Sequence, residues 1–173
     1  MMTYLKQLSP EDGKDIYDML QGIESEENGF FNDVKGMPYA EYQEWLRKND
    51  GFSRGIDLED WMVPHTFYWL YDGEKPVGHG RIRHWLTEKL KAESGHIGYA
   101  ITVSQRGKGY GTEILRLLLE ECRKMDIQVV QVGANKENVH SNKVILRNGG
   151  VLVESGEQKN KYYIYLHAQN HII

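Results

Sequence analysis

Residues 103–112 constrain the fold of this chain more than any other segment, because a glycine-rich turn there joins a strand to a helix. The preceding residues 95–103 (GHIGYAITV) are mostly apolar and predict a buried strand. Residues 112–125 carry apolar side chains at helical spacing and predict an amphipathic helix, with a stripe formed by Ile114, Leu115, Leu118, Leu119, Cys122 and Met125. A buried strand that leads through a turn into such a helix indicates an α/β domain.

Glycine occupies every second position of this turn, at Gly107, Gly109 and Gly111. The backbone amides therefore stay open, and the first turn of the next helix adds free N–H groups and the positive end of its dipole. Arg106 and Lys108 add positive charge nearby. The turn predicts a site for a phosphate or pyrophosphate.

Three glycine-rich signatures compete for this turn. The nucleoside-triphosphate loop needs GxxxxGK[ST], which does not occur in the chain. The dinucleotide fingerprint needs GxGxxG and an acidic residue about 20 positions later. Here the spacing is GxGxG, and the next predicted strand ends at Gly133, Ala134 and Asn135. The third signature is [RQ]xxGx[GA] between a strand and a helix, and residues 106–111 (RGKGYG) fit each of its fixed positions.

Further strands and helices are predicted around this unit. An Asp-Gly pair at residues 72–73 predicts a hairpin between strands at 65–71 and 76–85. Helices are expected at 10–21, 38–48 and 138–148, and other strands at 3–8, 127–133, 151–155 and 162–166. Residues 24–38 and 86–94 are expected to be loop or connection. This order indicates a single mixed α/β domain over residues 1–173.

Composition excludes several classes of protein. The 173 residues fit one domain, and a formal net charge of −4 argues against a dedicated nucleic-acid binder. No run of about 18 apolar residues occurs, and the first residues lack the apolar core of a signal peptide. We therefore expect no membrane partner and a cytoplasmic location. The single Cys122 permits no internal disulfide, and no cysteine cluster suggests a metal, so none is expected.

Residues 95–155 resemble the GNAT superfamily of acetyl-CoA-dependent N-acetyltransferases. The resemblance rests on the strand IGYAI, the loop RGKGYG and a segment at 138–149 that is similar to the helix N-x-x-S-x-x-[LV]-x-x-[KR]-x-G. The sequence pattern HIGY…RGKGYGTE…NGG is similar to that of a bacterial group of acetyltransferases with undefined substrate. The resemblance implies a mixed, mostly antiparallel sheet flanked by helices, with splayed central strands. It also implies a cofactor-binding core at 95–155 and acceptor-side elements at 1–94 and 156–173.

The resemblance also implies which residues bind acetyl-CoA. Backbone groups of Ile101 and Val103 would pair with the pantetheine, Asn138 would reach the same arm, and Ser141 would lie near the thioester. The pyrophosphate would be held by the amides of Arg106, Gly107, Lys108, Gly109, Tyr110, Gly111 and Thr112. From the residues alone, Asn138 equally fits the N-cap of the helix that follows it.

The implied chemistry is direct attack of a primary amine on the acetyl thioester in a ternary complex. The bound amine must lose a proton, and His96 is the candidate base on the predicted strand, with His79, His84 and Glu93 as alternatives.

The family often places a Tyr at the position held here by Ile145, where it protonates the departing thiolate. Because this Tyr is absent, a second hypothesis stays open: the chain is a non-catalytic domain that binds acetyl-CoA as a sensor or interaction module. The acceptor amine is not specified by any motif, and a homodimer is left open.

Overall fold

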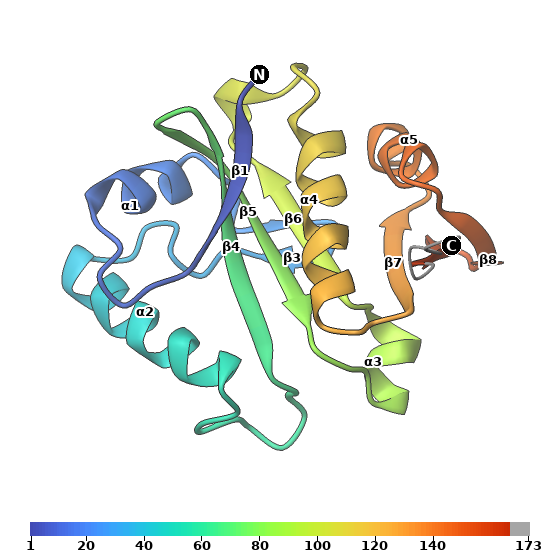
Figure 1. The fold of residues 1–173 in the computed structure, drawn as a ribbon, viewed down its shortest axis with the longest axis horizontal. Helices are drawn as coiled ribbons and strands as arrows, with labels where there is room; N and C mark the ends of the chain where they lie inside the picture. Colours follow the sequence, from blue (N-terminus) through green and yellow to red (C-terminus); the bar gives the residue numbers. More distant parts are fainter. Residues whose placement is uncertain (167–173) are drawn as a thin grey trace, which may run out of the picture.

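Two antiparallel sheets lie side by side in the computed structural model, which describes residues 1–166 (Figure 1). Residues 167–173, at the end of the predicted acceptor-side segment 156–173, lie outside the described residues. The first sheet has the order β1-β4-β5-β6 and the second β7-β9-β8. Their bounds are β1 Thr3–Gln7, β4 His65–Asp72, β5 Lys75–Arg83, β6 Ile97–Ile101, β7 Val129–Asn135, β8 Val151–Ser155 and β9 Lys159–Tyr165.

Helices cover both faces of the first sheet (Figure 1). On one face lie α1 (Lys14–Gln21), α2 (Tyr39–Ser53) and a small hairpin of β2 (Glu26–Glu27) and β3 (Phe30–Phe31). On the other face lies α4 (Tyr110–Lys124), whose apolar stripe, Cys122 included, is buried against the sheet. The remaining helices are α3 (Glu88–Glu93), and α5 (Val139–Arg147), which packs on α4 and β7. The expected mixed α/β, mostly antiparallel fold is confirmed.

Local signals in the sequence account for most of these elements. The hairpin of β4 and β5 turns where Asp72 and Gly73 predicted it, and α4 begins two residues before its predicted start. The predicted helix at 10–21 begins only at Lys14, because residues 9–12 form a turn closed by the Asp12 side chain. The predicted connection at 86–94 contains α3, which Thr87 caps by accepting a hydrogen bond from the Leu90 amide.

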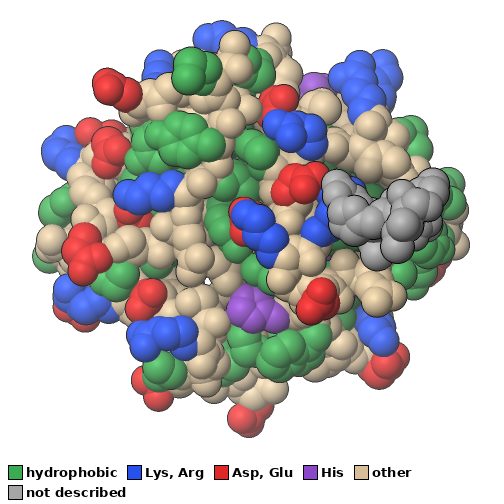
Figure 2. Space-filling model, in the orientation of Figure 1, with side chains coloured by type: hydrophobic (Ala, Val, Ile, Leu, Met, Phe, Trp, Pro, Cys, Tyr) green, Lys and Arg blue, Asp and Glu red, His purple; other side chains and the backbone are tan. Residues whose placement is uncertain are grey.

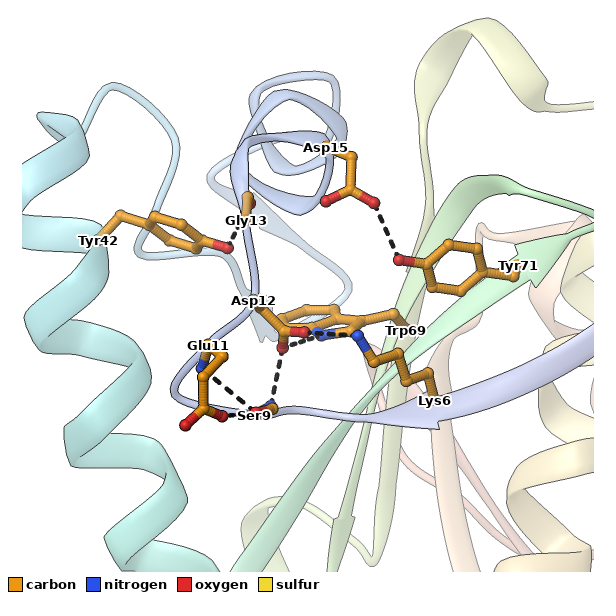
Figure 3. Close-up of polar contacts among 9 residues, drawn as sticks. All are labelled: Lys6, Ser9, Glu11, Asp12, Gly13, Asp15, Tyr42, Trp69 and Tyr71. Atoms are coloured by element: carbon orange, nitrogen blue, oxygen red, sulfur yellow. Dashed lines mark hydrogen bonds and ion pairs between the residues drawn. The ribbon is translucent and has the colours of Figure 1, made fainter.

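A cluster of buried polar contacts fastens the β1–α1 turn to the sheet (Figure 3). The fully buried Asp12 carboxylate accepts hydrogen bonds from the Ser9 amide (2.8 Å) and Trp69 Nε1 (2.8 Å), and Lys6 Nζ lies 3.0 Å away. Tyr42 on α2 donates to the Gly13 carbonyl at 2.9 Å. Chain segments far apart in sequence are thus joined around one carboxylate.

The two sheets meet at one end of β6 and β7 and separate beyond it. The His96 amide donates to the Gln131 carbonyl (2.8 Å), and the Gln131 amide donates to His96 Nδ1 (2.9 Å). A Cβ at Gly95 would lie 2.5 Å from the Gln131 carbonyl oxygen, so glycine is needed for this close approach. Past this junction, residues on both strands line a cavity instead of pairing. The expected splayed central strands are therefore present, as a fork that is closed at His96.

Charge is distributed evenly on the face of the molecule shown in Figure 2. Acidic and basic side chains alternate there, with no basic stripe over the described residues. In residues 1–166, no helix is long and apolar enough to cross a membrane.

Candidate functional site

The glycine-rich turn forms the connection between β6 and α4. A short 3₁₀ turn at Val103–Gln105 follows β6, and Gly107 and Gly109 then adopt φ of 78° and 85°. Side chains are disfavoured at such positive φ, which explains glycine at these two positions. Gly109 directly precedes α4, so the first amides of the helix have no intrahelical acceptor. The turn therefore presents free N–H groups where the sequence predicted an anion site.

A cavity of about 330 Å³, here called the loop cavity, lies against this turn. It brings together eight predicted cofactor residues, Ile101, Arg106, Gly107, Gly109, Tyr110, Gly111, Asn138 and Ser141. It also contains residues that the sequence did not single out for this role: Glu27, Asn28, Tyr99, Ala100, Gln105 and His140. One cavity thus takes its walls from β6, the turn, the starts of α4 and α5, and the β2–β3 hairpin.

Three predicted cofactor residues, Val103, Lys108 and Thr112, do not line the loop cavity. The Val103 amide donates to the Gly22 carbonyl at 2.9 Å and is not free for a ligand or an oxyanion. Lys108 is exposed, and its Nζ donates to Gln105 Oε1 at 2.9 Å. These contacts make the amides of Gly109, Tyr110 and Gly111 better placed for phosphate than the Lys108 side chain.

The Arg106 side chain binds within the protein. Its Nε donates to the Ile101 carbonyl at 3.2 Å, and its Nη2 lies 2.5 Å from the Glu27 carboxylate. Arg106 thereby holds the β2–β3 hairpin against the turn. The motif arginine shapes the rim of the cavity through its side chain.

Asn138 and Ser141 lie where β7 passes into α5. Asn138 Oδ1 accepts a hydrogen bond from the Ser141 amide at 2.9 Å, so Asn138 is the N-cap of α5. Both residues also line the loop cavity, which is compatible with a second role for Asn138.

A smaller cavity of about 90 Å³, the fork cavity, lies between β6 and β7. Its walls come from Gly98 and Tyr99 on β6, residues 132–134 on β7, the β2–β3 hairpin and Lys159 on β9. Glu27, Asn28, Tyr99 and Ser141 line both this cavity and the loop cavity. The two cavities therefore meet inside the fork.

Two hydroxyl groups mark this meeting point. Tyr99 Oη is buried and has no hydrogen-bond partner among the described residues. Burial raises the pKa of Tyr99, and the nearby Ser141 hydroxyl offsets part of that rise. The sequence signal for Tyr99 was a polar tip on an otherwise apolar strand. The Tyr99 hydroxyl, which has only Ser141 near it, indicates a place where a ligand can supply an acceptor.

His96 lies at the closed end of the fork, and the structure argues against its role as the base. Its Nδ1 accepts the Gln131 amide, and its ring lines a separate surface hollow with His84, Trp85 and Lys91. Burial, and then the charges of Arg83 and Lys91, lower the pKa of His96 to about 4. The imidazole therefore joins the two sheets and faces away from both cavities described above.

Ile145 is 1% exposed and packs in the core beneath α5. A Cβ at Gly150 would lie 2.5 Å from Ile145, which shows how closely the chain folds over it. Isoleucine has no proton to give, so the residue present here cannot act as the acid.

A forked sheet beside a glycine-rich turn is the arrangement that the resemblance to acetyl-CoA-dependent acetyltransferases implied. The chain belongs to the GNAT family, since the family model described as Acetyltransferase (GNAT) domain matches residues 3–151. It is an N-acetyltransferase, and acetyl-CoA is its co-substrate. No curated protein sequence matches the chain.

Several solved structures share the fold. One is the Campylobacter jejuni N-acetyltransferase PseH in complex with acetyl coenzyme A, with TM-score 0.63, 11% identity and coverage of 96% of this chain and 100% of that one. Another is the Salmonella typhimurium acetyl transferase that modifies the N-terminal serine of ribosomal protein L7/L12, with TM-score 0.62, 15% identity and 96% coverage of each chain. A third is Mycobacterium smegmatis RimJ in complex with CoA-disulfide, with TM-score 0.69, 16% identity and coverage of 94% and 81%. At these identities the likeness concerns the fold.

Proposed function

We propose that the protein transfers the acetyl group of acetyl-CoA to a primary amine by direct attack in a ternary complex. The observation that carries this proposal is the junction of the loop cavity and the fork cavity at Tyr99 and Ser141. A thioester held in the first cavity and an amine in the second would meet without a covalent enzyme intermediate. Most of the acceleration then comes from placing two substrates in one fork.

Acetyl-CoA would occupy the loop cavity. The amides of Gly109, Tyr110 and Gly111 at the start of α4 would hold the pyrophosphate, since helix N-termini favour anions. Ile101 and Asn138 line the path toward the fork. The hydroxyls of Tyr99 and Ser141 are positioned at the junction to stabilise the leaving thiolate.

Glu93 is our proposed proton acceptor, directly or through a water. It lines the fork cavity, and among residues 1–166 it has no ion-pair partner. Glu27 lines the same cavity but is paired with Arg106. His79 is sealed in the core, where burial and then Arg81 lower its pKa to about 3.

Initial-rate kinetics test the ternary complex. Double-reciprocal plots at several amine concentrations should intersect, whereas parallel lines would indicate a covalent acetyl-enzyme and contradict direct attack.

For the cofactor loop, Gly109→Leu should weaken acetyl-CoA binding about 100-fold in calorimetry, because it disrupts charge-assisted hydrogen bonds to phosphate. Gly149→Leu is the matched control: its φ of 88° is equally strained, but Gly149 lies outside the loop cavity.

The second candidate is a domain that binds acetyl-CoA without turnover, and the observation in its favour is the buried Ile145 at the usual acid position. Acetyl-CoA would then raise the melting temperature while no amine of a broad panel released CoA. Release of CoA with any amine rejects this candidate.

The division into a cofactor core at 95–155 and acceptor-side elements at 1–94 and 156–173 is part of the same proposal. The contributions of the β2–β3 hairpin and Lys159 to the fork cavity support it. A homodimer remains a proposal that sedimentation analysis tests directly.

A further inference from the structure

Arg81, on β5, separates the fork cavity from a third cavity. It lines both, and the third cavity, of about 230 Å³, lies between α2 and the ends of β4 and β5. We call it the aromatic cavity, after Trp45, Phe52, Trp61 and Phe67 in its walls. A single guanidinium thus faces two spaces of different character.

The charge of Arg81 has no acidic partner in the structure. Among residues 1–166 it forms no ion pair, and its Nε is buried without a hydrogen bond. The guanidinium lies over the Phe30 ring, 5.5 Å from the centroid. Burial, and then the neighbouring Arg83, lower the pKa of Arg81 to about 9. Arg81 is half-buried, with its Nε fully removed from water. A cation so shielded is costly without a partner, and such groups are normally paired with an anion.

The fold leaves room for this guanidinium. A Cβ at Gly98 would lie 2.9 Å from Arg81 Nη2 and 2.6 Å from the Phe30 ring. Glycine at position 98 lets both side chains cross β6 one residue before Tyr99. The placement of Arg81 beside the junction of the cavities is therefore built into the strand.

Charges of opposite sign flank Arg81. Glu93 and Glu27 line the fork cavity, together with Lys159 on its far side. Arg83 and Lys48 line the aromatic cavity, where Asp33 is the one acidic lining residue among residues 1–166. Arg83 is already engaged, since its Nη1 donates to Ser94 Oγ (2.6 Å) and to the Gly95 carbonyl (2.9 Å). Arg81 is thus the free cation at the boundary, with a carboxylate on the amine side.

We propose that the acceptor is an α-amino acid with a bulky apolar side chain. Its carboxylate pairs with Arg81, its amino group enters the fork cavity, and its side chain fills the aromatic cavity. The proposal rests on the proposed acetyl transfer and names its substrate class. A planar carboxylate matches the two-pronged donor geometry of one guanidinium. The α-carbon carries these three groups, so one can meet Arg81 while the other two enter the two cavities that Arg81 lines.

The reaction balances without a further reactant. The amino nitrogen forms a bond to the acetyl carbonyl carbon, and the bond from that carbon to sulfur breaks. The ammonium loses one proton to Glu93 or water before the attack. The same nitrogen loses a second proton to water as the bond to sulfur breaks, and CoA leaves as the thiolate. The products are an N-acetyl amino acid and CoA.

Matched substrates test the proposal. L-Phenylalanine and 2-phenylethylamine differ only in the carboxylate, and glycine keeps the carboxylate without the side chain. The kcat/KM for L-phenylalanine should exceed that for either partner by about 100-fold or more, since a site built for a polar group rejects the analogue that lacks it. Equal or greater kcat/KM for 2-phenylethylamine would overturn the proposal.

Variants of Arg81 locate the effect. Arg81→Met should lower kcat/KM for L-phenylalanine by about 100-fold and change that for 2-phenylethylamine by less than about threefold. Arg81→Lys should recover part of the loss, because it keeps the charge but not the fork. Unchanged acetyl-CoA affinity in calorimetry checks that the variants fold. Equal losses for both amines would contradict a role in carboxylate binding.

Product binding separates this proposal from the proposed function. N-Acetyl-L-phenylalanine should raise the melting temperature of the wild type, but not of Arg81→Met, whether or not turnover occurs. No turnover together with this Arg81-dependent shift would reject acetyl transfer and retain the carboxylate site. Turnover of amines without the shift or the carboxylate preference would retain acetyl transfer and reject the site.

Discussion

Two charged side chains on the same face of the first sheet, the buried Asp12 and the half-buried Arg81, have opposite surroundings. Asp12 accepts hydrogen bonds from Ser9 and Trp69 and pairs with Lys6 (Figure 3). Arg81 has no acidic partner among residues 1–166, its Nε lacks a hydrogen bond, and its guanidinium lies over the Phe30 ring. A buried charge with a complete set of partners holds a fold together, whereas one without them is available to a ligand. The contrast separates a structural site from a binding site within one layer of side chains.

The largest change in the free energy of unfolding is expected from Asp12→Ala. The substitution leaves Trp69 Nε1 and the Ser9 amide buried without an acceptor, and Lys6 without its partner. We expect the free energy of unfolding to fall by about 2–5 kcal/mol in urea denaturation, because each donor left without its acceptor costs about 1–3 kcal/mol. Asp18→Ala, which removes an exposed pair with Lys14, is the control and should cost less than about 0.5 kcal/mol. Similar values for both variants would show that Asp12 does not fasten the turn.

A pH-dependent effect is expected from His79, which lies between the two charges. Its ring is 1% exposed, contacts Phe30, Phe67 and Trp69, and has no partner for either nitrogen within residues 1–166. Its pKa of about 3 lies below the value near 6.5 of an unfolded chain. Between pH 6.5 and pH 3 the unfolded state therefore binds more protons than the folded state. The contribution of neutral His79 to the free energy of unfolding is fully present above pH 6.5, and it is lost as the pH falls below that value.

His79→Phe removes this term. Between pH 8 and pH 5 the wild type should lose about 2 kcal/mol more of its free energy of unfolding than the variant does. Urea denaturation at the two pH values measures the difference. Parallel losses in both proteins would show that His79 is not held neutral by the fold.

A smaller effect is expected where Gly98 makes room for Arg81. Gly98→Ala places a methyl group 2.6 Å from the Phe30 ring and should destabilise the protein by about 1–2 kcal/mol. Gly133→Ala, across the fork cavity, meets only the Asn160 carbonyl at 3.5 Å and should be neutral or slightly stabilising. Thermal and urea unfolding of the two variants give the comparison. A neutral Gly98→Ala would mean that Arg81 and Phe30 move aside freely.

The smallest effect on stability is expected from Arg81→Met, and its sign is opposite to that of Asp12→Ala. Replacing an unpaired buried cation by an apolar side chain of similar length removes a desolvation cost. The free energy of unfolding should stay within about 1 kcal/mol of the wild type or rise. A loss comparable to that of Asp12→Ala would show that Arg81 has a structural partner after all.

Local patterns predicted the elements and half of the site. The Asp72-Gly73 turn, the stripe on α4 and the glycines at 107, 109 and 111 act over a few residues, so one sequence suffices to recognise them. Val103 was misplaced because its amide partner, the Gly22 carbonyl, comes from a distant segment. His96 was expected at an open cleft, but the contact with Gln131 closes the fork there.

Arg81 was missed for a related reason. Alternation along β5 shows that His79 and Arg81 share a face, but not that β3 and α2 cover it and leave the guanidinium between two cavities. The available signal was a charged residue inside the strand predicted at 76–85. Whether Arg81 has an acidic partner depends on the folded structure and cannot be inferred from the sequence.

The single cysteine can report how often the hydrophobic core opens. Cys122 is fully buried on α4, and burial raises the pKa of its thiol to about 12. At pH 8 only about one thiol in 10,000 is then ionised, even before access is considered. During turnover, a thiol reagent should react with the CoA that is released but not with the buried Cys122. The folded enzyme therefore adds no signal of its own. In the absence of substrates, the same reagent labels Cys122 only when α4 lifts from the sheet, so the labelling rate reports how often the core opens.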